Sequence, residues 1–206
     1  PTEITLVAVS KRFPAEAIQE ALDAGQLVFG ENYLQEAAAK RAVLGDKVRF
    51  HFIGHLQSNK AKIAAATFDM IETVDRVKIA AALNRNLEAL DRKLDILIQV
   101  NVGRDNAKSG VLPDQTAALL EQIKTFRHLT PKGLMTMPPL SDTSEESRVH
   151  FKNLHALGKK MQSYGLLPEK EMELSMGMSG DFTVAIEEGA TLLRIGTAIF
   201  GKRPPR

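Results

Sequence analysis

Short apolar runs and longer stretches of helical period alternate along the whole of this 206-residue chain. The short runs are rich in Val, Ile, Leu and Phe and have the length of strands, whereas the longer stretches have the length of helices. The expected strands are 4–10, 27–31, 49–54, 70–74, 93–101, 131–137, 171–176 and 192–197, and the expected helices are 14–24, 32–43, 59–66, 76–90, 113–125, 143–163 and 180–188. Because parallel neighbours need crossover connections, this alternation predicts a parallel sheet of the α/β class.

The number of strands favours a closed barrel over an open sheet. An open doubly wound sheet and a closed barrel both fit the alternation, but eight nearly all-apolar strands favour a single (β/α)8 TIM barrel. Such barrels usually run to about 250 residues, so this chain stands at the short end. No linker or second domain is visible, and residues 1–206 are expected to form one domain.

Composition argues against several kinds of function. The chain has no cysteine, which excludes disulfides, thiolate metal sites and cysteine nucleophiles. Its net charge is +2 and the charges are interspersed, so nucleic acid is not an expected partner. No apolar run approaches the roughly 18 residues of a membrane span, so no membrane partner is expected and the expected location is cytoplasmic. The histidines lack metal-site spacing, and His51 is expected to pack inside the barrel.

Residues with distinctive chemistry follow the expected strands, where a barrel of this kind binds its ligands. Lys11 follows the first strand, and a lysine amine freed by burial is a nucleophile for carbonyls. Ser179, Gly196 and Thr197 follow the last two strands, where small residues and a helix opening at Ser179 would form a phosphate cradle. Arg194 lies within the last apolar strand and needs either an acidic partner or a ligand.

These three features together fit pyridoxal 5′-phosphate (PLP) as the cofactor, with its aldehyde on Lys11 and its phosphate at the cradle. Two other hypotheses stay open. One is a Schiff-base aldolase that acts on a phosphorylated carbonyl substrate, with Glu31 as its acid/base group. The other is a binding module for another phosphorylated metabolite. The methionines at 135, 137, 176 and 178 alternate at strand period and are expected to fill the barrel.

Four segments in order resemble the pyridoxal phosphate homeostasis proteins, whose fold is that of the N-terminal barrel of alanine racemase. The segments are Leu6–Lys11, Phe29–Tyr33, His51–Lys60 and Leu174–Gly201, and the resemblance runs over nearly the whole chain. It implies that Lys11 forms the Schiff base, that Arg194 faces the pyridine nitrogen and that Asn32 lines the cofactor. For the phosphate it implies a site made by Ser175, Ser179, Gly196 and Thr197. Members of this family usually begin with a helix ahead of the first strand, and this helix is expected to be absent here.

The same resemblance implies a role in vitamin B6 and amino-acid homeostasis. An arginine at the pyridine nitrogen would leave that nitrogen unprotonated and weaken the cofactor as an electron sink. Racemisation also needs a second base, and neither Tyr33 nor Tyr164 is well placed to supply one. We therefore expect a PLP carrier or buffer with little or no racemase activity, which hands PLP to PLP-dependent apoenzymes. The alternative is a weak amino-acid racemase. Without a second racemase domain, a monomer is expected rather than a dimer.

Overall fold

A computed structural model describes residues 4–139 and 143–202 of the chain, and within them eight parallel strands close into a barrel. The strands are β1 (Thr5–Val9), β2 (Val28–Glu31), β3 (Arg49–Phe52), β4 (Met70–Val74), β5 (Leu94–Gln99), β6 (Leu129–Met135), β7 (Glu173–Ser175) and β8 (Leu192–Ile195). Each strand pairs with the next one, and β8 pairs with β1 from Thr5↔Leu192 to Ala8↔Ile195. The predicted (β/α)8 barrel is confirmed.

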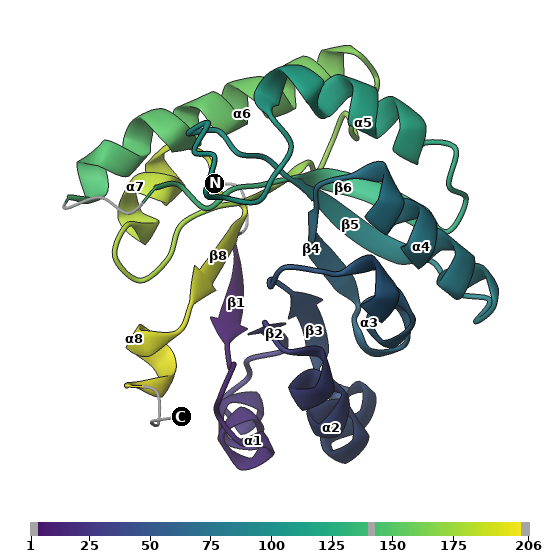
Figure 1. Cartoon of the computed structure of the whole chain (residues 1–206). Helices are drawn as coiled ribbons and strands as arrows, with labels where there is room; N and C mark the ends of the chain where they lie inside the picture. The colour runs from purple at the N-terminus through teal and green to yellow at the C-terminus, as the bar shows by residue number, and fades with distance from the viewer. Residues whose placement is uncertain (1–3, 140–142, 203–206) are drawn as a thin grey trace.

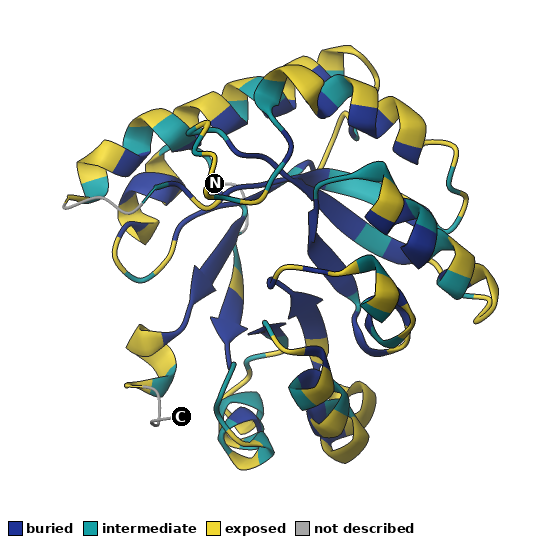
Figure 2. Cartoon of the chain, viewed as in Figure 1, coloured by how far each residue is buried: buried dark blue, intermediate teal, exposed yellow. Residues whose placement is uncertain are grey.

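The helices lie around the outside of the strand ring (Figure 1). They are α1 (Ala15–Asp23), α2 (Leu34–Leu44), α3 (Ala61–Thr67), α4 (Val77–Glu88), α5 (Thr116–Ile123), α6 (Arg148–Ser163), α7 (Phe182–Glu187) and α8 (Thr197–Phe200). Short 3-10 turns occupy Gly45–Lys47, Ser58–Lys60, Pro113–Gln115 and Ser144–Ser147. Figure 2 shows the division of burial: the strands are buried almost throughout, while the outer faces of the helices are exposed.

Two helices differ from the sequence-based expectation. The helix expected to open at Ser179 begins at Phe182 instead, because Gly177 turns the chain with a φ of +93° and the next residues stay in the loop. A Cβ at Gly177 would also lie 2.6 Å from the Cβ of Ala185, so the turn needs glycine on both counts. The short helix α8 was not predicted, because four residues are too few for a helical period to be visible.

Alternate residues of the strands point outward to the helices and inward to the barrel. The outer set forms one continuous core with the helices, in which Phe52 and Phe68 pack edge to face at 5.1 Å. A separate inner cluster consists of Met70, Leu97 and Met135, as expected for a methionine that fills the barrel. The prediction that all four methionines fill the barrel is confirmed only for Met135. Met176 is buried in the outer core, and Met137 and Met178 lie just beyond the strand ends, where they are exposed.

Within residues 4–139 and 143–202, no helix combines the length and the apolar character that a membrane span requires. The same residues contain no group of three histidine or carboxylate side chains placed to hold a metal ion.

Candidate functional site

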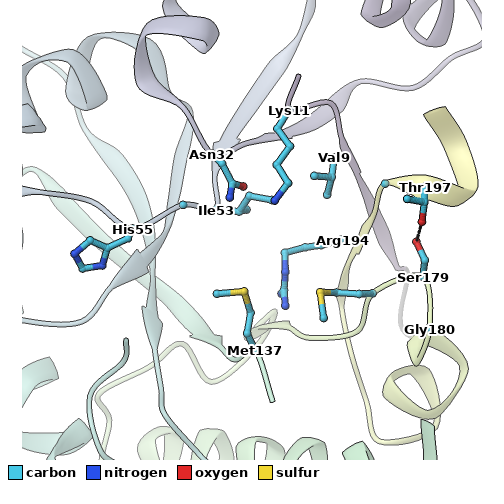
Figure 3. A pocket seen from close by; sticks show the side chains of 13 residues that line it. Val9, Lys11, Asn32, Ile53, His55, Met137, Ser179, Gly180, Arg194 and Thr197 are labelled. Carbon is cyan, nitrogen blue, oxygen red and sulfur yellow. Dashed lines mark hydrogen bonds between the residues drawn. The ribbon is translucent and has the colours of Figure 1, made fainter. Parts of the chain in front are cut away.

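A pocket of about 330 Å³ opens at the ends of the strands, where the sequence predicts a site. Six of the seven residues expected there line it, namely Lys11, Asn32, Ser179, Arg194, Gly196 and Thr197. Figure 3 shows the Lys11 and Arg194 side chains pointing into this space, with Ser179 and Thr197 on one side of it and His55 on the opposite side. Met137 and Met178 also line the pocket, which gives it apolar surface between these polar groups.

Lys11 enters the pocket from a tight turn directly after β1. The turn is closed by the Phe13 N–H, which donates to the Ser10 carbonyl at 3.1 Å. Asn32 lines the pocket beside Lys11 from the end of β2 (Figure 3), and its Oδ1 is buried with no hydrogen-bond partner within the described residues. A buried acceptor without a partner is costly, so this atom fits a ligand that donates a hydrogen bond. Gly54 packs against the Asn32 backbone so closely that a Cβ there would lie 2.6 Å from the Asn32 carbonyl oxygen.

Two hydroxyl groups meet at the side of the pocket that β7 and β8 form. The Thr197 hydroxyl donates to the Ser179 hydroxyl at 3.3 Å, and Gly180 and Gly196 lie beside them in the lining. Hydroxyl donors with adjacent glycine backbone are suited to an anion such as phosphate. The expected cradle residues are therefore together, although Ser179 reaches the pocket from a loop and not from the first turn of α7.

Arg194 is buried on β8 and still lines the pocket. Its Nη2 donates to the Thr136 carbonyl at 2.8 Å, and its Nη1 donates to the Ser175 hydroxyl. The sequence left a choice between an acidic partner and a ligand for this guanidinium. Its direct partners are instead a carbonyl and a hydroxyl, and these fix its planar group at the floor of the pocket.

A chain of hydrogen bonds continues from Ser175 across the barrel interior. The Ser175 hydroxyl donates to Glu72 Oε2 at 2.5 Å, and Glu72 Oε1 is 2.8 Å from His51 Nδ1. Burial raises the pKa of Glu72, but the hydrogen bond from His51 and the charges of His51 and Arg194 outweigh it and hold that pKa below its usual value. His51 lies inside the barrel, as predicted.

Ser175 is the one expected site residue that does not line the pocket. It is fully buried, and its hydroxyl accepts from Arg194 while donating to Glu72. Ser175 therefore holds the Arg194 side chain from a position outside the pocket lining. Sequence reasoning missed Glu72, for which the available signal was a single acidic residue within the apolar run 70–74.

The acid/base group that an aldolase would need is not at the pocket. Glu31 is fully buried and does not line it. Its Oε1 accepts from the Ser10 hydroxyl at 2.7 Å and from Lys40 Nζ at 2.5 Å. Burial raises the pKa of Glu31, while the Lys40 charge opposes that shift. With this carboxyl held by Lys40, no observation favours the aldolase hypothesis.

Fold and pocket together define a class of protein: a (β/α)8 barrel that presents a lysine at the end of its first strand and an anion cradle at the last two. The family model for the alanine racemase N-terminal domain matches residues 3–204. The pyridoxal phosphate homeostasis protein of Pasteurella multocida is 42% identical over 204 residues, covering 97% of this chain and 87% of that protein. The chain belongs to this family of pyridoxal phosphate homeostasis proteins.

Solved structures agree with this assignment. PipY of Synechococcus elongatus, in a structure with PLP bound, is 40% identical, with a TM-score of 0.89 and coverage of 98% of this chain and 94% of PipY. An alanine racemase of Clostridium difficile superposes with a TM-score of 0.79 at 13% identity, covering all of this chain and 53% of the racemase. At that identity the racemase supports the fold alone.

Proposed function

We propose that this protein binds PLP in the described pocket, as a Schiff base on Lys11, and acts as a carrier or buffer of the cofactor. The observation that carries the proposal is the meeting of Lys11, Arg194 and the Ser179–Thr197 hydroxyl pair in one pocket. The unpartnered Asn32 Oδ1 in the same wall is a buried acceptor that a hydrogen-bond donor on the ligand would satisfy. The names of the relatives and the PLP in the PipY structure support the same ligand.

Each pocket residue would make a different contact with PLP. PLP supplies an aldehyde, at which a lysine amine forms a C=N bond while the aldehyde oxygen leaves as water with two protons from the nitrogen. Lys11 would provide that amine. Ser179 and Thr197 would donate to the phosphate beside the Gly196 backbone, and Arg194 would face the pyridine nitrogen. Ser175 and Glu72 would hold Arg194 in that position.

The proposed activity is storage and transfer without racemisation. A guanidinium is only a hydrogen-bond donor, so it can pair with an unprotonated pyridine nitrogen but cannot accept a hydrogen bond from a protonated one. Both tyrosines of the chain are exposed on helix ends, Tyr33 at the start of α2 and Tyr164 at the end of α6, and neither lines the pocket. A second base for the far face of a substrate is therefore not supplied by either of them.

The wider role follows from reversible binding. We propose that residues 1–206 form one PLP-binding domain that works as a monomer in the cytoplasm. Its recipients would be PLP-dependent apoenzymes, which receive the cofactor when another amine displaces Lys11.

A visible absorbance spectrum tests the proposal directly. Addition of PLP to the purified protein is expected to give an absorption band in the visible range, and borohydride reduction followed by peptide mass mapping is expected to place the adduct on Lys11. No band, or an adduct spread over surface lysines, would overturn the proposal. Incubation with L-alanine, followed by chiral analysis, separates the carrier from a racemase, because only a racemase accumulates D-alanine.

The phosphate end of the pocket gives a second prediction. Ser179→Ala and Thr197→Ala are each expected to weaken PLP binding by about tenfold to a hundredfold, since a hydrogen bond to a charged group contributes about 1.5–3 kcal/mol. Isothermal titration calorimetry measures the affinities. Thr125→Ala removes an exposed hydroxyl outside the pocket and is expected to leave the affinity unchanged. Equal affinities for all three variants would show that the phosphate does not bind at this side.

A further inference from the structure

A buried lysine lies behind the turn that carries Lys11. Lys40 is on α2 and only 5% exposed, and its ammonium group makes three close contacts. They are Glu31 Oε1 at 2.5 Å, Glu36 Oε1 at 2.6 Å and the Ser10 carbonyl at 2.9 Å, so all three N–H donors have acceptors. Burying an ion pair costs several kcal/mol per ion and is often no better for stability than apolar packing. A gain in stability alone is therefore a poor explanation for this cluster.

The side chains of Lys40, Glu31 and Glu36 hold both neighbours of Lys11. On one side, the Ser10 carbonyl accepts from Lys40, and the Ser10 hydroxyl donates to Glu31 Oε1 at 2.7 Å. On the other side, the Arg12 backbone N–H donates to Glu36 Oε1 at 2.5 Å. The backbone is thus fixed directly before and directly after Lys11 by groups from α2 and the end of β2.

The turn itself needs such support. Lys11 and Arg12 are its two central residues, and Arg12 has a φ of +69°, in the left-handed region that favours glycine. A residue other than glycine in that region costs of order 1 kcal/mol and persists only where the surrounding structure holds it. The bond from the Arg12 N–H to Glu36 supplies that hold, which ties the strained residue to the direction in which Lys11 leaves the turn.

We propose that Lys40, Glu31 and Glu36 form a clamp that fixes this turn and aims Lys11 into the pocket, so that they are positioning residues for the Schiff base. The proposal rests on the proposed function, in which Lys11 forms that link. None of the three clamp residues lines the pocket, so the clamp acts through the backbone of Lys11 and not through contact with PLP. The phosphate side of the pocket lies elsewhere in the chain, with Ser179 in the loop after β7 and Thr197 at the start of α8.

Because the clamp supports Lys11 and not the phosphate side of the pocket, two ligands are expected to respond differently to loss of the clamp. PLP needs a correctly aimed Lys11, because a small displacement of a reacting group can cost about a hundredfold in rate. Pyridoxine 5′-phosphate has the same ring and phosphate with an alcohol in place of the aldehyde, and it cannot form a Schiff base. Clamp variants should therefore lose PLP adduct formation while they keep the affinity for pyridoxine 5′-phosphate.

Lys40→Met and Glu36→Ala test the clamp. Glu36 is partly exposed, so its variant keeps the test open if Lys40→Met does not fold. Gln35→Ala, an exposed position on the same helix, is the matched control. Stopped-flow absorbance at saturating PLP measures the rate of adduct formation, and calorimetry measures the affinity for pyridoxine 5′-phosphate. We expect the rate to fall about tenfold or more in both clamp variants, with the affinity within about twofold of wild type. Glu36→Gln, which keeps an acceptor oxygen for the Arg12 N–H, is expected to restore most of the rate.

Three outcomes would overturn the clamp. Folded variants with a wild-type rate would show that Lys11 is aimed without it. An equal loss for both ligands would show that the cluster maintains the whole pocket and not Lys11 in particular. A wild-type protein that forms no adduct on Lys11 would overturn the proposed function together with the clamp, and this result is distinguishable because it appears before any substitution is made.

Discussion

Replacing Lys11 with alanine is expected to abolish the visible band that PLP produces with the wild-type protein. The side chain that enters the pocket after β1 would then end at Cβ, and no other lysine lines that pocket. Borohydride treatment would leave no reduced adduct in the peptide that contains position 11. The remaining contacts of the phosphate and ring would still hold PLP without a covalent link, so binding by calorimetry is expected to weaken but not to disappear.

Lys62→Ala is the matched control for this experiment. Lys62 is exposed on α3 and does not line the pocket, and its removal is expected to leave both the band and the adduct on Lys11 unchanged. Retention of the full band in Lys11→Ala, with an adduct on a different lysine, would contradict the assignment of the Schiff base. Circular dichroism of both variants separates loss of the link from loss of the fold.

Glu72→Gln is expected to lower the free energy of unfolding by about 3–5 kcal/mol, because it removes a buried negative charge and leaves buried cationic partners with less compensation. Glu72 contacts His51 directly and is linked to the buried Arg194 through the Ser175 hydroxyl, which accepts from Arg194 and donates to Glu72. Glutamine keeps the shape of glutamate, so the loss reports on charge and not on a cavity. Urea unfolding followed by circular dichroism measures it. Glu88→Gln, at an exposed position on α4, is expected to change stability by no more than about 0.5 kcal/mol.

The pH dependence of the difference in unfolding free energy between wild type and Glu72→Gln gives an independent check. The pKa of Glu72 is held below the ordinary glutamate value of 4.5. A carboxyl with a lower pKa in the folded chain stabilises the fold above its unfolded-state pKa, and this contribution is lost as the pH falls through the folded-state pKa. The gap between wild type and Glu72→Gln should therefore be full at pH 7 and narrow below pH 4.5. A gap that stays constant down to acid pH would contradict a role for the Glu72 charge.

The barrel could be predicted from sequence because its main signal is local. Each strand lies in a short run that is mostly apolar, as expected for a strand between a filled interior and a layer of helices. The predicted helices from α1 to α7 were likewise visible from their period. The short helix α8 gave no such signal, and the start of α7 depended on the turn at Gly177, which hydrophobic pattern alone does not locate.

The pocket residues were predictable for a different reason. In a barrel the ends of all strands meet, so Lys11 and Thr197 could be brought together from topology alone. The hydrogen bonds that support these pocket residues could not be predicted from topology. Glu72 and Ser175 are 103 residues apart, and their contact depends on which side chains face each other across the interior. Lys40 was missed because a lysine in an amphipathic helix ordinarily lies on the exposed face, and its buried position appears only once Glu31 and Ser10 are packed against α2.

The pairing of β1 with β8 has a consequence for how the protein is made. The first and last strands are hydrogen-bonded neighbours from Thr5↔Leu192 to Ala8↔Ile195, so the ring cannot close before the end of β8 has left the ribosome. Lys11 is synthesised before Arg194, Gly196 and Thr197, which lie on and just after β8. During translation the nascent chain therefore carries Lys11 before it carries the other residues that we propose to bind PLP. Under the proposed function, specific loading becomes possible only once β8 has been synthesised and has paired with β1.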